Sequence, residues 1–112
     1  MRIFKILPSA EWTAAQAAGR FDGSAIDRQD GYIHFSTAAQ AQETASRHFA
    51  GLADLVVLEV EGDDLGVDLK WEPSRGGALF PHLYGSLAVD HVRAVHPATL
   101  DADGVPQIRL PA

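Results

Sequence analysis

Apolar and polar positions are patterned differently in the two halves of the chain. Residues 2–7 place apolar side chains around a single lysine, which is typical of a short strand. The alanine-rich segment 10–18 favours a helix, with Ser9 as its predicted cap and Gly19 as its terminator. The chain is therefore expected to begin with a strand followed by a helix.

A second strand and helix are predicted after a polar connection. This connection, residues 19–31, leads to a predicted strand at residues 32–36. Thr37, with Gln40 three residues later, has the capping-box pattern of a helix that ends near Phe49. Two helices are thus expected in the N-terminal half.

The second half of the chain is rich in predicted strands. The segment 54–61 contains a nearly continuous apolar run, which indicates a central strand buried on both faces. Apolar and polar side chains alternate at residues 67–72, which predicts another strand. Two further strands are predicted at 88–96 and 106–110. Early helices followed by strands predict an α+β fold, one domain over residues 1–112, with a curved and largely antiparallel sheet.

Composition narrows the class of protein. The chain has 112 residues, a formal net charge of −6 and no cysteine. Disulfides, thiolate nucleophiles and cysteine metal sites are therefore excluded. The negative charge argues against binding long nucleic acid, and no apolar run approaches the ~20 residues that cross a bilayer. With no secretory signal among the first residues, we expect a cytoplasmic protein that binds a small-molecule ligand.

The first candidate site follows from the predicted second strand. Tyr32, His34 and Ser36 share one face of such a strand, and the residues between them point into the core. An imidazole and a hydroxyl on one face can hold a sugar hydroxyl or move a proton. Ser36 and Thr37 also precede a helix N terminus, whose free amides attract anions. In the alternative interpretation, His34 bonds a neighbouring carbonyl and Ser36 or Thr37 only caps the helix.

A second group of candidate residues lies farther along the chain. His82 and Tyr84 fall in a segment that reads as a loop, where an imidazole, a phenol hydroxyl and an aromatic face suit ligand contact. Trp71 and Glu72 end a predicted strand on opposite faces, and Glu72 is the candidate catalytic carboxylate. The spacing of His34, Glu72 and His82 matches no compact metal motif, so no metal site is predicted.

Three motifs resemble a known family. They are residues 30–37 (Asp-Gly-Tyr-Ile-His-Phe-Ser-Thr), 69–72 (Leu-Lys-Trp-Glu) and 80–85 (Phe-Pro-His-Leu-Tyr-Gly). In this order they resemble a family of small bacterial proteins, domain-of-unknown-function family 952, and Lys5 and Trp12 fit its opening block. The resemblance carries no established reaction. It implies a fold similar to the ADP-ribosyltransferase fold, a split, twisted antiparallel sheet whose cleft holds NAD in the enzymes that use it.

Within that wider fold, His34 and Ser36 look like the His-Leu-Ser block of the tRNA 2′-phosphotransferases, in which the histidine helps bind the nucleotide. The leading hypothesis is therefore a nucleotide-handling protein that binds NAD or ADP-ribose and transfers an ADP-ribosyl or a phosphoryl group. The alternatives are a noncatalytic binding module for a small metabolite or peptide, and a structural domain with core histidines. The candidate catalytic residues are His34, Glu72 and His82; the candidate ligand-binding residues are Tyr32, Ser36, Thr37, Trp71 and Tyr84.

Overall fold

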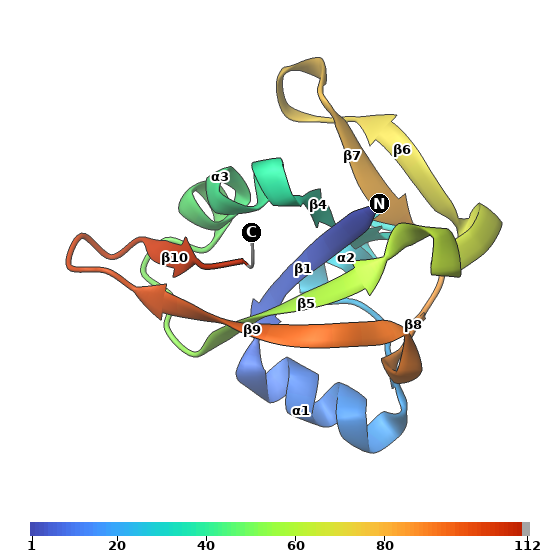
Figure 1. Ribbon diagram of the computed structural model, residues 1–112, viewed down its shortest axis with the longest axis horizontal. Coiled ribbons are helices and arrows are strands. Elements are labelled where there is room, and N and C mark those ends of the chain that lie inside the picture. Colours follow the sequence, from blue (N-terminus) through green and yellow to red (C-terminus); the bar gives the residue numbers. More distant parts are fainter. Residues whose placement is uncertain (111–112) are drawn as a thin grey trace.

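Apolar strands build the main sheet of the protein. The computed structural model, which describes residues 1–110, has a five-stranded antiparallel sheet in the order β10-β9-β5-β1-β4 (Figure 1). The prediction that the run at 54–61 forms a central strand is confirmed, since β5 lies between β9 and β1. The five strands are β1 (Arg2–Pro8), β4 (Ser36–Thr37), β5 (Leu55–Glu61), β9 (Val92–Leu100) and β10 (Pro106–Ile108).

Two smaller sheets complete the strand arrangement. One contains β3 (Ile33–His34), β7 (Leu79–Leu83) and β6 (Leu69–Pro73), again antiparallel. The other pairs β2 (Arg20–Phe21) with β8 (Leu87–Ala88). The β6–β7 hairpin projects away from the five-stranded sheet (Figure 1). The antiparallel α+β architecture predicted from the sequence is therefore confirmed, with the strands divided among separate sheets.

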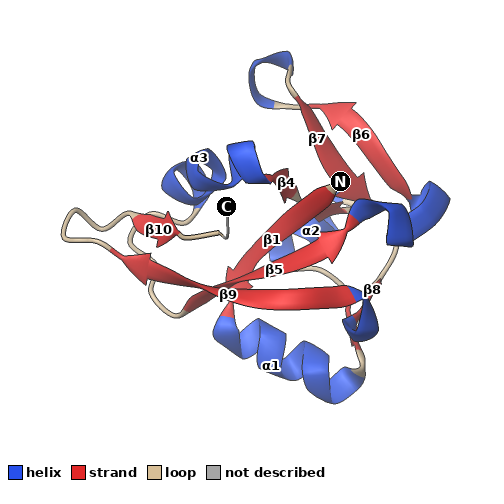
Figure 2. Cartoon of the chain, viewed as in Figure 1, coloured by secondary structure: helices blue, strands red, loops and turns tan. Residues whose placement is uncertain are grey.

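Helices flank the main sheet on both sides. Figure 2 shows α1 (Ser9–Ala18) and α3 (Ala38–His48) on either side of the central strands. A third α-helix, α2 (Ala25–Asp30), occupies the segment expected to be a connection. Within residues 1–110, no helix is long and apolar enough to span a membrane. Short 3-10 segments are η1 (Gly62–Asp68), η2 (Arg75–Gly77) and η3 (Val89–His91).

Several predicted boundaries need correction. Ser9 is the first residue of α1, and Pro8 occupies the cap position without a side-chain hydrogen bond. The strand predicted to begin at Val67 begins at Leu69, because the preceding residues form η1. The strand predicted at 88–96 is interrupted by η3, and its long part begins afterwards as β9.

The segment around His82 is a strand, and its interpretation as a loop was wrong. Pro81 made a central strand improbable from the sequence, because proline cannot donate a ladder hydrogen bond. The Pro81 carbonyl accepts a hydrogen bond from the Phe35 amide at 3.0 Å. Because the nitrogen and the carbonyl of one residue in an antiparallel strand face the same neighbour, the Pro81 nitrogen also faces β3. Since β3 ends at His34, the missing donor interrupts no bond within β3.

Strand β1 contributes apolar side chains to both faces of the main sheet. Ile3 and Leu7 belong to the larger core cluster, which also receives residues from α1 and the three-stranded sheet. Phe4 and Ile6 point to the opposite face, where they pack with Ala45 of α3. This division places α1 and α3 on opposite sides of β1 and fixes the position of the loops between them.

The capping box that begins α3 supplies a prediction about stability. Thr37 Oγ1 accepts from the Gln40 amide at 3.2 Å, and Gln40 Oε1 accepts from the Thr37 amide at 3.0 Å. Thr37→Ala should lower the unfolding free energy by about 1 kcal/mol. Urea denaturation measures this loss. Thr13→Ala, at an exposed position of α1, is the matched control, and an equal effect of both changes would contradict the capping role.

Candidate functional site

The candidate site lies where the chain passes from one sheet to the other. His34 ends β3 and pairs with β7, whereas Ser36 begins β4 and pairs with β1. Between them, the Phe35 amide donates to the carbonyl of Pro81. The single strand predicted at 32–36 is therefore two short strands of different sheets. A cleft is present at this transition, with His34 and Ser36 in its wall.

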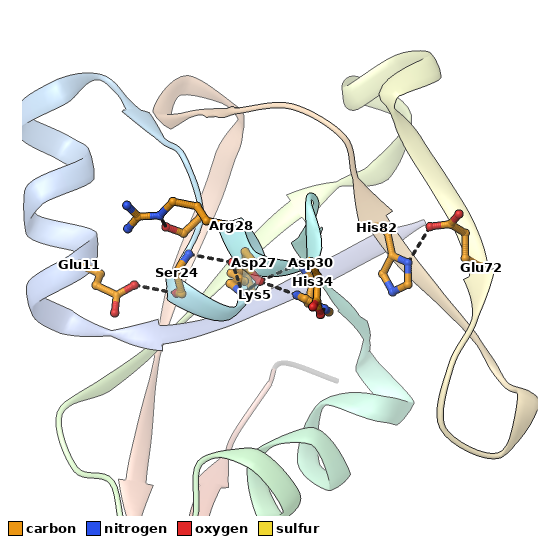
Figure 3. Close-up of polar contacts among 10 residues, drawn as sticks. Lys5, Glu11, Ser24, Asp27, Arg28, Asp30, His34, Glu72 and His82 are labelled. Atoms are coloured by element: carbon orange, nitrogen blue, oxygen red, sulfur yellow. Dashed lines mark hydrogen bonds and ion pairs between the residues drawn. The ribbon is translucent and has the colours of Figure 1, made fainter.

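His34 is held between two carboxylates. Its Nδ1 lies 2.5 Å from Asp27 Oδ1, and its Nε2 lies 2.9 Å from Asp30 Oδ2 (Figure 3). Both carboxylates belong to α2, where Gly31 ends the helix at a φ of 89° that favours glycine. Ionised carboxylates only accept hydrogen bonds, so both contacts are hydrogen bonds at the same time only when each ring nitrogen carries a proton. The interpretation of His34 as bound to a neighbouring carbonyl is thus replaced by a carboxylate clamp.

Asp27 is the centre of the polar network. The carboxyl is only 1% exposed and lies 2.8 Å from the Lys5 ammonium, which is itself buried. It also accepts from the backbone amides of Ser24 at 2.9 Å and His34 at 3.2 Å. Lys5 occupies the same face of β1 as two core residues, so its charge requires a buried partner. The ion pair therefore connects the main sheet to α2 within the wall of the cleft.

The environment determines the protonation of this pair. Burial by itself raises the pKa of the Asp27 carboxyl, but hydrogen bonds and charge from His34 and Lys5 outweigh it and lower that pKa to about 2. Burial lowers the pKa of the Lys5 ammonium, and the facing Asp27 carboxylate opposes this shift. Asp27 is consequently an anion at neutral pH, and it acts only as a hydrogen-bond acceptor.

Acid should remove the stabilisation that Asp27 provides. Because its pKa falls from 3.8 when unfolded to about 2 when folded, ionised Asp27 stabilises the fold by about 2 kcal/mol above pH ~5. This contribution decreases as the pH falls through 4 and is lost near pH 2. A ¹³C NMR titration of the Asp27 carboxyl should give a midpoint near 2. A midpoint at or above 4 would contradict the buried ion pair.

His82 forms a second histidine–carboxylate pair. It is 3% exposed, and its Nδ1 lies 2.8 Å from Glu72 Oε1. The Tyr84 hydroxyl donates to the same oxygen at 2.8 Å. These hydrogen bonds, first that from His82 and then that from Tyr84, lower the pKa of the Glu72 carboxyl. Glu72 is therefore an acceptor, and the His82 Nδ1 that faces it carries a proton. Among the groups that the structure describes, no hydrogen bond involves His82 Nε2.

Tyr32 joins the two histidines. Its ring stacks on His82 with centroids 4.1 Å apart, and it lies 4.6 Å from the His34 ring. The His34 and His82 rings meet edge to face at 5.6 Å. Burial and nearby carboxylates raise the pKa of the Tyr32 phenol, so it stays protonated at neutral pH. His34, Tyr32 and His82 thus form a contiguous aromatic and polar surface.

These side chains line a cleft of about 640 Å³. His34, His82, Tyr32 and Ser36, four of the predicted site residues, lie in its wall. The size is within the range of small-molecule sites. In Figure 3, His82 lies between His34 and Glu72, with Asp27 and Lys5 beyond His34. The wall also includes aromatic and aliphatic residues, namely Phe4, Ile6, Pro8, Ile26, Phe35, Phe49 and Phe80.

The other predicted residues have different positions. Thr37 caps α3 and does not line the cleft, and Trp71 lies opposite Pro81 on the other face of β6 from Glu72. Glu72 and Tyr84 support His82 from behind and are absent from the cleft wall. Trp71 and Thr37 are therefore not retained as ligand-binding residues. Ser36 is buried, and its hydroxyl lies 2.9 Å from that of Thr44.

Sequence reasoning missed the carboxylate side of the site. Asp27, Asp30 and Lys5 were not proposed as functional residues, although their contacts hold His34 in place. One signal was available, since Ser24 and Asp27 have the spacing of a capping box and predict helix α2. Among the described residues, no group of three or more metal-ligating side chains is arranged around a common point.

The fold and the cleft define a small α+β protein with a histidine–carboxylate site. The chain belongs to the family described as Protein of unknown function (DUF952), whose model matches residues 6–95. This confirms the family resemblance seen in the three sequence motifs. A search of curated proteins gives no match to the chain.

Solved structures of one relative have the same fold. The chain is 60% identical to protein CC0527 from Caulobacter crescentus, whose crystal structure superposes with a TM-score of 0.93. That match covers 96% of this chain and 94% of the relative. The solution NMR structure of CC0527 matches with a TM-score of 0.85 at 60% identity, covering 95% and 91% of the two chains.

Proposed function

We propose that this protein is a nucleotide-handling transferase or hydrolase that cleaves the N-ribosyl bond of a nicotinamide nucleotide such as NAD. The observation that carries the proposal is the environment of His82. Its ring is almost fully buried, Glu72 fixes its Nδ1, and Nε2 has no hydrogen-bond partner among the described side chains and backbone although the His82 side chain lines the cleft. An oriented imidazole with one free nitrogen is suited to accept a proton.

In this reaction the bond between ribose C1′ and the pyridinium nitrogen breaks. Both bonding electrons stay with nitrogen, so neutral nicotinamide leaves and positive charge develops on the ribose. Water or an acceptor hydroxyl forms the new C1′–O bond and transfers its proton to His82 Nε2. Glu72 does not contact the reacting atoms in this scheme. It is a positioning residue, which replaces the sequence-based proposal that Glu72 contacts substrate.

Carboxylates near His34 support the choice of this reaction. Asp30 is a partly exposed anion beside His34, and Asp27 lies just below it. Negative charge in a cleft stabilises an oxocarbenium-like ribose and disfavours transfer of an anionic phosphoryl group. The Tyr32 ring offers an aromatic surface next to His82. The separation of the five-stranded and three-stranded antiparallel sheets supports the ADP-ribosyltransferase-like framework that belongs to this proposal.

Binding and turnover of NAD test the proposal together. The ¹⁵N-labelled chain should show saturable amide shifts confined to residues 32–40 and 80–85. Chromatography should detect nicotinamide released by the wild type and not by His82→Gln. His91→Gln is the matched control, because His91 lies outside the cleft wall. Absence of both shifts and nicotinamide release at millimolar NAD would exclude the proposed function, whereas binding without release would favour a noncatalytic binding module.

A further inference from the structure

The β6–β7 hairpin has an open strand edge. In the three-stranded sheet, whose order is β3-β7-β6, strand β6 is the last strand and pairs with β7 alone among the described residues. Figure 1 shows β6 on the outer side of the hairpin, away from β1 and β4. The edge of a sheet presents backbone amides and carbonyls that can pair with a strand of another chain. This edge is therefore a candidate interaction surface.

Hydrogen bonds of the hairpin show which backbone groups of β6 face outward. The Pro81 carbonyl faces β3, where it accepts a hydrogen bond. In an antiparallel ladder, two opposite residues point their amides and carbonyls either toward each other or both away, so Trp71, opposite Pro81, points its own outward. The Tyr84 amide donates to the Asp68 carbonyl at 2.8 Å, so the next residue, Leu69, faces outward as well.

Apolar side chains lie exposed beside this edge. Trp71 is 39% exposed, and Leu79 on the neighbouring strand is 52% exposed. Both lie on the hairpin face opposite Glu72, because Leu79 pairs with Pro73, which is two residues from Trp71. A large aromatic side chain in water next to an open strand edge is typical of a surface that another protein chain covers.

The sequence of β6 is complementary to itself in the antiparallel direction. Lys70 and Glu72 lie on either side of Trp71 and share one face of the strand. If two copies of β6 pair with Trp71 at the centre, Lys70 of each copy stands opposite Glu72 of the other. These positions are non-hydrogen-bonded pairs, in which opposite side chains come closest. The charges on this edge therefore favour a second copy of the same strand over a strand of unrelated sequence.

We propose that the protein forms a two-fold symmetric dimer in which β6 pairs antiparallel with β6 of a second copy. The proposal goes beyond the N-ribosyl reaction and does not depend on it. The amide and carbonyl of Trp71 bond to those of Trp71 in the other copy, and the Leu69 amide donates to the Pro73 carbonyl. Because proline has no amide hydrogen, the ladder ends at Pro73.

This dimer adds a charged residue beside each candidate site. Glu72 accepts from both His82 and Tyr84 through Oε1, which leaves Oε2 for a further donor among the described contacts. Lys70 of the second copy stands opposite this carboxylate. A neighbouring ammonium favours the ionised form of Glu72, which is the form that accepts from His82 Nδ1. The interface therefore supports the orientation of His82.

Sedimentation velocity from micromolar to millimolar concentration tests the dimer. Lys70→Glu gives each edge two acidic side chains, so attractive pairs become repulsive and the dissociation constant should rise at least about 10-fold. Arg109→Glu is the matched control. It makes the same change in net charge at an exposed position that follows β10, on the opposite side of the molecule from β6 in Figure 1, and should leave the dissociation constant unchanged.

Mixing two variants tests the register of the strands. Glu72→Lys gives the edge two basic side chains, so this chain should also remain monomeric by itself. An equimolar mixture with Lys70→Glu should form a heterodimer, because each acidic side chain then stands opposite a basic one. Recovery on mixing also shows that neither variant has lost the fold of its hairpin.

The possible results separate the second copy from other partners. A wild type that stays monomeric at millimolar concentration would overturn the dimer and leave the edge of β6 to a strand of another protein. A dimer that Lys70→Glu does not weaken would place the interface on another surface and also overturn the proposal. A mixture that stays monomeric would exclude the pairing centred on Trp71.

Discussion

Asp27→Asn is expected to lower the unfolding free energy by about 3 to 5 kcal/mol, because it leaves the buried Lys5 ammonium without a counter-charge. The asparagine side chain is nearly the same size, so the loss is electrostatic and not a packing defect. It still offers one oxygen as an acceptor, but it cannot satisfy Lys5, His34 and two backbone amides together. Urea denaturation at neutral pH measures the change.

Two further variants separate the ion pair from general disruption of α2. Lys5→Met in the Asp27→Asn background removes both charges, so it should restore part of the lost stability. Asp22→Asn provides the matched control, since Asp22 and Arg20 are exposed and solvent screens their ion pair, so its loss should change the stability little. A cost for Asp27→Asn no larger than that for Asp22→Asn would exclude a structural role for the buried pair.

The sequence predicted the elements whose local pattern agrees with their final environment. The continuous apolar run of β5 specifies a central strand, and the Thr37–Gln40 capping box specifies the start of α3. Strand β7 is harder to predict, because a proline such as Pro81 is unfavourable inside a sheet. It is tolerated here because the neighbouring strand β3 ends at His34, before the position that faces Pro81. That condition depends on a partner almost fifty residues away.

The histidines of the site could be predicted from the sequence, but the roles of its carboxylates could not, because these depend on contacts between distant segments. His34 and His82 stand out by residue type, and their pairing across β3 and β7 brings them together. Asp27 gains its importance from a contact with Lys5, 22 residues earlier, that no local pattern encodes. Trp71 and Glu72 alternate along β6, as expected, but the role of Glu72 depends on the register that pairs β6 with β7 and brings Glu72 to His82.

Glu72→Gln should lower kcat for nicotinamide release by about 10²- to 10⁴-fold while changing KM much less, because Glu72 acts through His82. The new amide can donate a hydrogen bond to Nδ1. This moves the imidazole proton to Nε2 and removes the lone pair that accepts the substrate proton. Long-range ¹H–¹⁵N NMR spectra of the His82 ring measure the tautomer directly, without ligand, and should change from Nδ1–H in the wild type to Nε2–H in the variant.

A second glutamate–histidine pair supplies the control. Glu59 Oε1 lies 2.7 Å from His96 Nε2 in the main sheet, close to the 2.8 Å of the Glu72–His82 contact, but neither residue lines the cleft. Glu59→Gln should therefore leave kcat unchanged even if it alters the His96 ring. If Glu72→Gln keeps full turnover and the Nδ1–H tautomer, Glu72 does not orient His82. If it loses turnover to the same extent as Glu59→Gln, the effect is not specific to the cleft, and the histidine would need another source of orientation.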